Sequence, residues 1–153
     1  MKPRRVFFVR GPADCPLETD FKKDQPKFDR FYMPHWHTQM ELCYVTRGQL
    51  EIFDLGGNFT LSPGDIYIAP PDHVHGNRVL ENGTDYWTVV FSPELITVPE
   101  THFFYAGFVG PLREGRLQIP PVIHPENPHY PALHAHLQRL LEADLSHPDL
   151  SRE

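Results

Sequence analysis

Prolines divide this chain into short apolar runs, and they limit the elements it can form more than any other feature of the sequence. Seventeen of the 153 residues are proline, about one in nine against a usual share of about 5%. Proline lacks an amide donor and interrupts helices and central strands, so it gathers in turns and loops. We therefore expect many short strands joined by turns, and no long helix before the last quarter of the chain.

Turn signals between the apolar runs indicate the same class of structure. Gly56, Gly57 and Asn58 form a hairpin signal, because tight hairpin turns need positive φ angles, which Gly and Asn adopt at low cost. A second turn is predicted at 62–65, where Pro and Gly stand side by side. The strand-like runs cover residues 6–10, 41–45, 50–55, 59–61, 66–69 and 85–91. With the alternating residues at 73–77, these make about seven short strands, and turns at this spacing predict an antiparallel β-sandwich or barrel.

Residues that commonly bind metals are concentrated in the stretch 34–48. His35 and His37 stand two residues apart, so on a strand both imidazoles project from one face. Glu41 would lie roughly 13 Å beyond His37 on a straight strand, whereas the ligands of one ion sit about 2 Å from it. Either the chain turns at 38–40 and brings Glu41 back beside the histidines, or Glu41 belongs to something else. We predict the turn.

The last quarter of the chain changes character. Leu133, Leu137, Leu140, Leu141 and Leu145 recur with helical spacing, which predicts an amphipathic helix over about 131–145. Two interpretations remain open for its apolar stripe. The helix packs wholly on its own β domain, or it packs partly on that domain and partly on a second subunit. In the second case Leu133, Leu137, Leu140 and Leu141 form the dimer contact.

Charge and cysteine content exclude several classes of protein. The net charge is −6, and no face rich in Lys and Arg is evident, which argues against a nucleic-acid-binding surface on this chain. No apolar run is long enough for a signal peptide or a membrane span, so we expect a cytoplasmic protein. Cys15 and Cys43 are the two cysteines, and they do not suggest a disulfide framework.

Two motifs in the first half resemble those of the cupin family. His35, His37, Glu41 and Gly48 have the spacing of the first cupin motif, and the second motif is matched by Gly64, Pro70 and His75. The resemblance implies an antiparallel jelly-roll barrel in which His35, His37, Glu41 and His75 are the metal ligands. The chain departs from the motifs at Asp29, Asp72 and Val79, positions that shape turns and do not bind metal.

A narrower resemblance covers nearly the whole chain. The string His-x-His-x-x-x-Glu-Leu-x-Tyr-Val-x-x-Gly is followed by Leu-Ser-Pro-Gly-Asp-Ile-Tyr-Ile-Ala-Pro-Pro, then by Tyr-Trp-x-x-x-Phe-Ser-Pro-Glu-Leu and a leucine-rich helix. This order looks like the N-terminal effector-binding and dimerisation domain of AraC-type transcription regulators. The resemblance implies a homodimer that contacts DNA only through a helix-turn-helix domain, and nothing after Leu145 supplies one. The expected organisation is an arm with a first strand (1–31), the cupin barrel core (32–92) and a C-terminal extension (93–153).

Two function classes follow. The first, which we favour, is a sensor that binds a small molecule such as a sugar, a metal ion, or both; the second is a metal-dependent cupin enzyme such as a dioxygenase or isomerase. Imidazole and carboxylate ligands suit Zn, Ni, Mn, Fe or Cu. Without a metal, the four residues would hydrogen-bond one another and a small organic ligand. By strand parity and residue type, the candidate ligand-binding residues are Phe53, Tyr67, His73 and Trp87, although aromatic residues at such spacings often belong to the core.

Overall fold

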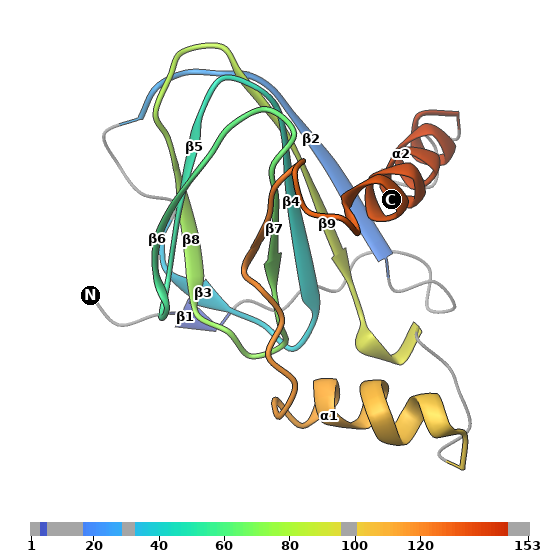
Figure 1. The fold of residues 1–153 in the computed structure, drawn as a ribbon. Helices are drawn as coiled ribbons and strands as arrows, with labels where there is room; N and C mark the ends of the chain where they lie inside the picture. Colours follow the sequence, from blue (N-terminus) through green and yellow to red (C-terminus); the bar gives the residue numbers. More distant parts are fainter. Residues whose placement is uncertain (1–3, 6–16, 29–32, 96–100, 147–153) are drawn as a thin grey trace.

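The computed structural model describes residues 4–5, 17–28, 33–95 and 101–146. Two five-stranded β-sheets face each other (Figure 1). The strands are β1 (Arg4–Arg5), β2 (Leu17–Gln25), β3 (His35–Trp36), β4 (Met40–Arg47), β5 (Leu50–Asp54), β6 (Gly57–Leu61), β7 (Ile66–Ala69), β8 (His75–Val79), β9 (Thr84–Phe91) and β10 (Val122–Ile123). They form a mainly antiparallel cupin-type jelly-roll barrel, which confirms the predicted fold class.

Strands that are distant in sequence lie side by side in both sheets. One sheet has the order β1-β3-β8-β5-β6, and the other has the order β10-β7-β4-β9-β2. β1 and β3 pair in parallel, whereas the other pairs are antiparallel. Because β3 and β4 are consecutive but belong to different sheets, the short connection between them carries the chain from one sheet to the other. This crossing places the stretch 34–48 where the two sheets meet.

The turn at Gly48, between β4 and β5, requires glycine for two reasons. Its φ angle is 76°, in the left-handed region that side chains rarely adopt. A Cβ atom at this position would also lie 2.3 Å from Thr84 Oγ1 and 2.9 Å from Thr84 Cα. The close approach allows the β4–β5 hairpin to pack directly against the start of β9.

The buried apolar residues of the described chain form two clusters. The inner cluster fills the barrel between the sheets and contains Cys43, Val45, Leu50, Ile52, Leu61, Tyr67, Ala69, Val79 and Tyr86. The outer cluster covers the far face of the β7-β4-β9 sheet and contains Met40, Tyr44, Ile66, Ile68, Trp87, Val89, Leu112, Leu137 and Leu141. Alternation along β4 and β9 assigns successive residues to opposite clusters. Both faces of this sheet are therefore buried.

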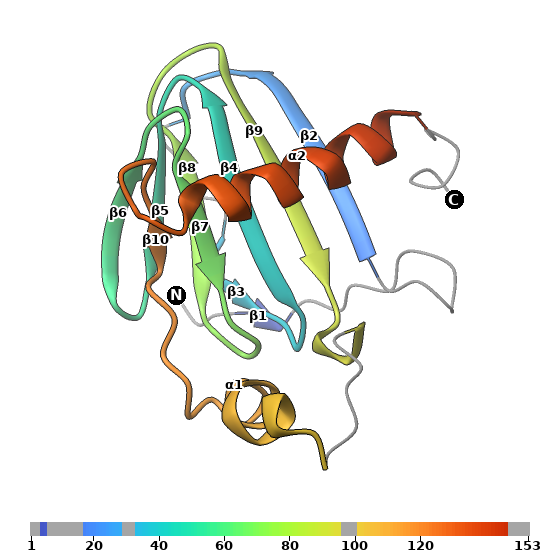
Figure 2. The same cartoon turned by 45° about the vertical axis from the view of Figure 1, so that its right-hand side comes forward.

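Helical segments follow the barrel strands. A 3-10 turn (Pro93–Leu95) begins where Ser92 Oγ accepts a hydrogen bond from the amide of Glu94 at 3.3 Å. A π-helical segment (Tyr105–Val109) continues into α1 (Gly110–Arg113) below the barrel. The long helix α2 (Tyr130–Ser146) covers the predicted range 131–145 and lies across β4, β9 and β2 (Figure 2).

The N-terminal segment differs from the expected arm. The strand predicted at 6–10 lies outside the described residues. Leu17–Gln25, which the sequence analysis assigned to the arm, is an edge strand that pairs with β9. The sequence did not indicate this strand because most of its residues are polar. Its residue Phe21 stacks on Trp87 with ring centroids 4.6 Å apart. The outer cluster thus extends to the edge of the sheet through this strand.

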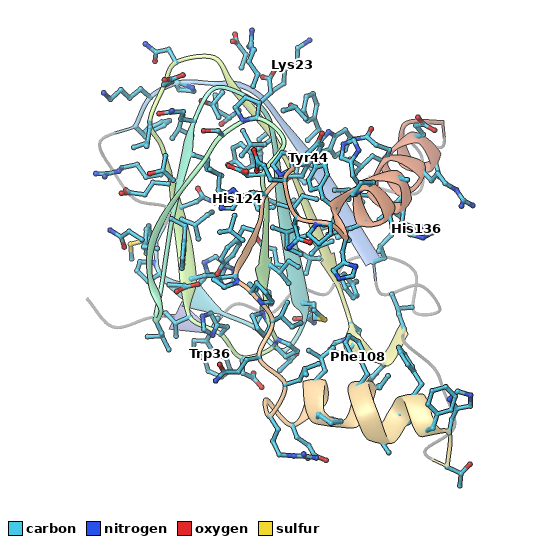
Figure 3. The ribbon with its side chains drawn as sticks, viewed as in Figure 1. Lys23, Trp36, Tyr44, Phe108, His124 and His136 are labelled. Carbon is cyan, nitrogen blue, oxygen red and sulfur yellow. The ribbon has the colours of Figure 1, made fainter. Side chains whose placement is uncertain are left out.

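The leucine stripe of α2 packs on its own barrel. Leu137 and Leu141 are each 3% exposed and belong to the outer cluster. Leu133 and Leu140 are partly buried and pack against the same cluster. All four leucines proposed for a dimer contact are therefore engaged within one subunit. His136 projects from the opposite side of the helix, away from the sheet (Figure 3).

Candidate functional site

The four predicted metal ligands lie together at one end of the barrel. His35 comes from β3, His37 from the β3–β4 connection, Glu41 from β4 and His75 from β8. One potential ligand atom from each residue lies within 4.8 Å of those of the others, and all four residues are buried. The structure thus brings together residues separated by as many as forty positions.

The turn between β3 and β4 creates this proximity. Thr38 and Gln39 form a bend, after which β4 begins at Met40 in the opposite sheet. The amide of Asp72 donates to the carbonyl of His37 at 2.7 Å, which fixes the connection against the β7–β8 loop. The predicted turn therefore exists, and it returns Glu41 to His37 with Nε2 and Oε2 3.2 Å apart.

Backbone carbonyls orient all three imidazoles in the same way. The Nδ1 atoms of His35, His37 and His75 lie 3.1 Å from Met33 O, 3.1 Å from Gln39 O and 2.9 Å from His73 O, respectively. A carbonyl oxygen can only accept, so each Nδ1 carries the proton and donates it. In a neutral imidazole the lone pair then resides on Nε2. This is the arrangement found around metal-binding histidines, where the second nitrogen is held by an outer partner.

Glu41 shows that the cluster needs a positive charge. Its Oε2 atom lies 3.2 Å from His37 Nε2 and 3.3 Å from His75 Nε2. If both imidazoles were neutral with Nδ1 protonated, two lone pairs would face a carboxylate oxygen at contact distance. Protons on the Nε2 atoms, or a metal cation, would remove this repulsion. The donor set of three nitrogens and one carboxylate therefore fits a divalent transition metal.

The pKa values of the buried groups follow from the same contacts. Burial by itself raises the pKa of Glu41, but the hydrogen bonds from His37 and His75 outweigh it and lower the pKa from 4.5 to about 2. Burial lowers the pKa of His35, and the charge of His75 lowers it further. Burial also opposes protonation of His75, but its hydrogen bond to Glu41 raises the pKa overall. The cluster thus keeps Glu41 ionised and favours a proton on His75.

We expect acid to destabilise the metal-free protein through Glu41. Because its folded pKa is lowered to about 2, its contribution to stability is complete above pH 4.5 and is lost as the pH falls toward 2. The loss should amount to roughly 3 kcal/mol. Urea unfolding of chelator-treated protein between pH 6 and 2 would measure it. A Glu41→Gln protein should show a flatter dependence over this range, and equal slopes would contradict the assignment.

Of the four residues predicted to line a ligand pocket, Tyr67 and His73 lie next to the cluster. The Tyr67 ring is buried inside the barrel, 6.3 Å from that of His75 between centroids. Both residues approach Asp54, which sequence reasoning missed. Tyr67 donates to Asp54 Oδ2 at 3.1 Å, and His73 Nε2 lies 3.5 Å from the same atom. An acid at the end of a strand, just before the turn at 55–56, resembles an ordinary turn residue, so no sequence signal marked it.

Phe53 and Trp87 are placed away from the barrel interior. Trp87 belongs to the outer cluster beneath α2, and its neighbour Tyr86 is the inward residue of β9. Phe53 follows the inward Ile52 on β5 and therefore faces the outside of its sheet. The structure does not bring either residue to the cluster. For Trp87, alternation could not show which face is the interior, because both faces of β9 carry apolar residues. Phe53 shares the outer face of β5 with Glu51, which pairs with Arg78.

Comparison with protein families identifies the domain. Residues 25–145 match the family model described as "AraC-like ligand binding domain". The chain belongs to this family. The resemblance inferred from the sequence is thereby confirmed, and a domain of this family is a ligand-sensing module. The match includes the cluster and α2, so both are parts of the AraC-like ligand binding domain of this chain.

Solved structures show partial similarity to this AraC-like domain. KdgF from Halomonas sp. is 28% identical, with 50% of this chain and 78% of that chain covered and a TM-score of 0.40. A cupin 2 conserved barrel domain protein from Salinispora arenicola is 18% identical, with 55% and 70% covered and a TM-score of 0.46. An HTH_3 family transcriptional regulator from Vibrio cholerae is 20% identical, with 56% and 48% covered and a TM-score of 0.47.

Neither a curated relative nor, in the described part of the chain, a membrane-spanning helix was found. No curated protein matches the sequence. Within the described ranges, no helix is both long enough and apolar enough to cross a membrane.

Proposed function

We propose that this AraC-like domain senses a small molecule at a metal centre formed by His35, His37, Glu41 and His75. One observation carries the proposal: three Nε2 atoms, each oriented by a hydrogen bond from its Nδ1, converge with a carboxylate oxygen in a buried site. Zn, Ni, Mn, Fe or Cu would suit these four ligands. When bound, such a metal supplies a Lewis-acidic position for an oxygen or nitrogen atom of the effector.

Strand β4 is the proposed route from the site to the helix α2. Its inward residue Glu41 belongs to the metal cluster, and its outward residue Tyr44 points toward α2 (Figure 3). The Tyr44 hydroxyl contacts His134 Nε2 at 2.9 Å, and Tyr130 stacks on the same imidazole with ring centroids 5.2 Å apart. A shift of β4 on effector binding would therefore change how α2 packs on the sheet. Effector binding would in this way favour one arrangement of α2 over another.

The proposal includes a homodimer and an indirect role in transcription. The domain would act in the cytoplasm as part of a regulator that contacts DNA through a helix-turn-helix domain outside this chain. Leu137 and Leu141 are buried within the subunit and Leu133 and Leu140 are partly buried, so the dimer contact would use the exposed parts of Leu133 and Leu140, other surface residues, or both. This arrangement is supported by the family of the domain and by its net charge of −6, which does not favour direct contact with DNA.

Ligand-dependent stabilisation tests the sensing function. We expect a small-molecule effector found in a library of sugars and other metabolites to raise the melting temperature of the metal-loaded protein, because it binds only the folded state. The Tyr44→Phe protein should bind metal and effector with unchanged affinity. However, it should lose the change that the effector causes in proteolytic protection of α2. A Tyr44→Phe protein that retains this change would contradict the route through β4.

A metal-dependent enzyme, such as a dioxygenase or isomerase, is the alternative. The observation that favours it is the ligand set itself, because four protein ligands leave positions open on an octahedral metal. Mass spectrometry of an effector incubated with the metal-loaded protein distinguishes the two functions. A sensor returns the effector unchanged, whereas an enzyme yields a product at a rate that depends on the metal.

A further inference from the structure

We propose that Asp54, Tyr67 and His73 form a hydrogen-bond-accepting wall beside the metal centre, and that this wall selects a neutral, hydroxyl-bearing ligand and disfavours anions. The inference rests on the proposed function, because it names the class of molecule that the same site would take. Three observations support it: the contacts of Asp54, its position opposite His75, and the direction of the hydrogen bonds.

Asp54 is a buried carboxylate held by several donors. Its side chain is 3% exposed. The Tyr67 hydroxyl donates to Oδ2 at 3.1 Å, and the amide of Gly56 donates to Oδ1 at 2.6 Å. His73 Nε2 lies 3.5 Å from Oδ2. Both oxygens thus accept a hydrogen bond, and they hold the carboxylate of Asp54 in place at this end of the barrel.

The wall adjoins the metal cluster. Asp54 on β5 pairs directly with His75 on β8, so the two residues are cross-strand neighbours. The ring of Tyr67 is 6.3 Å from that of His75. The side chain of His73 is 30% exposed, whereas the three histidines of the cluster are buried. His73 therefore connects the buried centre with the outside.

The charges near the centre do not favour an anionic ligand. A divalent cation bound by three neutral imidazoles and Glu41 carries one net positive charge. The carboxylate of Asp54, the cross-strand neighbour of His75, offsets that charge. An anion entering this end of the barrel would lose its hydration without meeting a net positive charge, and that is unfavourable. A neutral ligand has no such cost.

The hydrogen bonds leave acceptors available. Tyr67 uses its proton toward Asp54, so only the lone pairs of its oxygen remain for a ligand. When His73 directs an Nε2–H toward Asp54, its Nδ1 atom is likewise an acceptor. A hydroxyl group can give its oxygen to a metal and its proton to one of these acceptors. A carboxylate has no proton to donate. Its oxygens would therefore lie against other hydrogen-bond acceptors without forming a hydrogen bond.

Azide binding to the Co²⁺-loaded protein tests the wall, with visible absorption as the measurement. We expect the Asp54→Asn protein to bind azide about tenfold more tightly than the unmodified protein, because one nearby negative charge is removed. The matched control is Glu51→Gln, which makes the same change of charge on the outer face of β5, where Glu51 pairs with Arg78. This control should leave azide affinity unchanged. Equal affinity in Asp54→Asn and unmodified protein, or an equal gain in Glu51→Gln, overturns the inference.

A second measurement uses the unmodified protein and does not depend on the folding of a variant. Melting temperatures of the Co²⁺-loaded protein are compared with D-galactose against D-galacturonate, and with D-glucose against D-glucuronate. We expect any stabilisation to be larger with the neutral sugar, and a larger effect of either uronate overturns the inference. Failure of the unmodified protein to take up Co²⁺ is a separate result, seen before azide or sugar is added, and it contradicts the metal centre as well as the wall.

Discussion

We expect the His37→Ala protein to lose metal binding by at least about 100-fold, because removing a direct ligand should cost more than the 10- to 100-fold known for outer partners. His37 is 1% exposed and contributes one of three converging nitrogens. Isothermal titration with Zn²⁺ would measure the affinity. The unmodified protein should also be stabilised by about 3 to 4 kcal/mol at free metal concentrations of about 100 to 1,000 times the Kd, and the variant should not.

His134→Ala is the matched control for this prediction. His134 is a partly buried histidine that lies on α2 and contacts Tyr44 outside the cluster. Its replacement should reduce stability without changing metal affinity. The metal centre is contradicted if the His37→Ala protein still holds about one equivalent of metal, or if the unmodified protein binds none. Proton release on metal binding would give independent support, since the cluster favours a proton on His75 in the metal-free state.

The sequence predicted the centre better than the pocket around it. His35 and His37 had to share a face, and the distance argument required a turn before Glu41; both follow from the geometry of one strand. The position of His75 came from the family motif, because no local rule relates residues on strands that are distant in the sequence. Its pairing with His35 across β3 and β8 depends on the whole barrel topology.

The residues that line the site depend on which face of each strand is the interior. Parity separates Tyr86 from Trp87, but both are large, aromatic and buried. Since α2 covers the outer face, the sequence offers no polar side to distinguish the two. Asp54 was missed for the opposite reason, because a buried acid looks like a surface turn residue until its donors are known. A covering helix and a buried charge therefore limit what alternation alone can predict.

The second large effect is expected in the outer cluster, at Leu137. Its side chain is 3% exposed and packs with Trp87 and Leu141 between α2 and the sheet. We expect Leu137→Ala to lower the free energy of unfolding by about 2 to 5 kcal/mol, through lost apolar burial and the cavity left behind. Urea denaturation followed by circular dichroism would measure the change. His136→Ala, on the exposed side of the helix, should change stability by less than about 0.5 kcal/mol.

Protein concentration separates this role of Leu137 from a dimer contact. A residue that packs within one subunit lowers unfolding stability equally at low and high protein concentration, whereas a residue of a dimer interface has an effect that depends on concentration. We expect the Leu137→Ala protein to show the first behaviour and to keep the oligomeric state of the unmodified protein on sizing. A change from dimer to monomer with little loss of stability would instead place the leucine stripe between subunits. Because α2 packs on the barrel, we expect this stripe to control the stability of the helix in both cases, and the concentration dependence of the Leu137→Ala protein tests whether it also controls assembly.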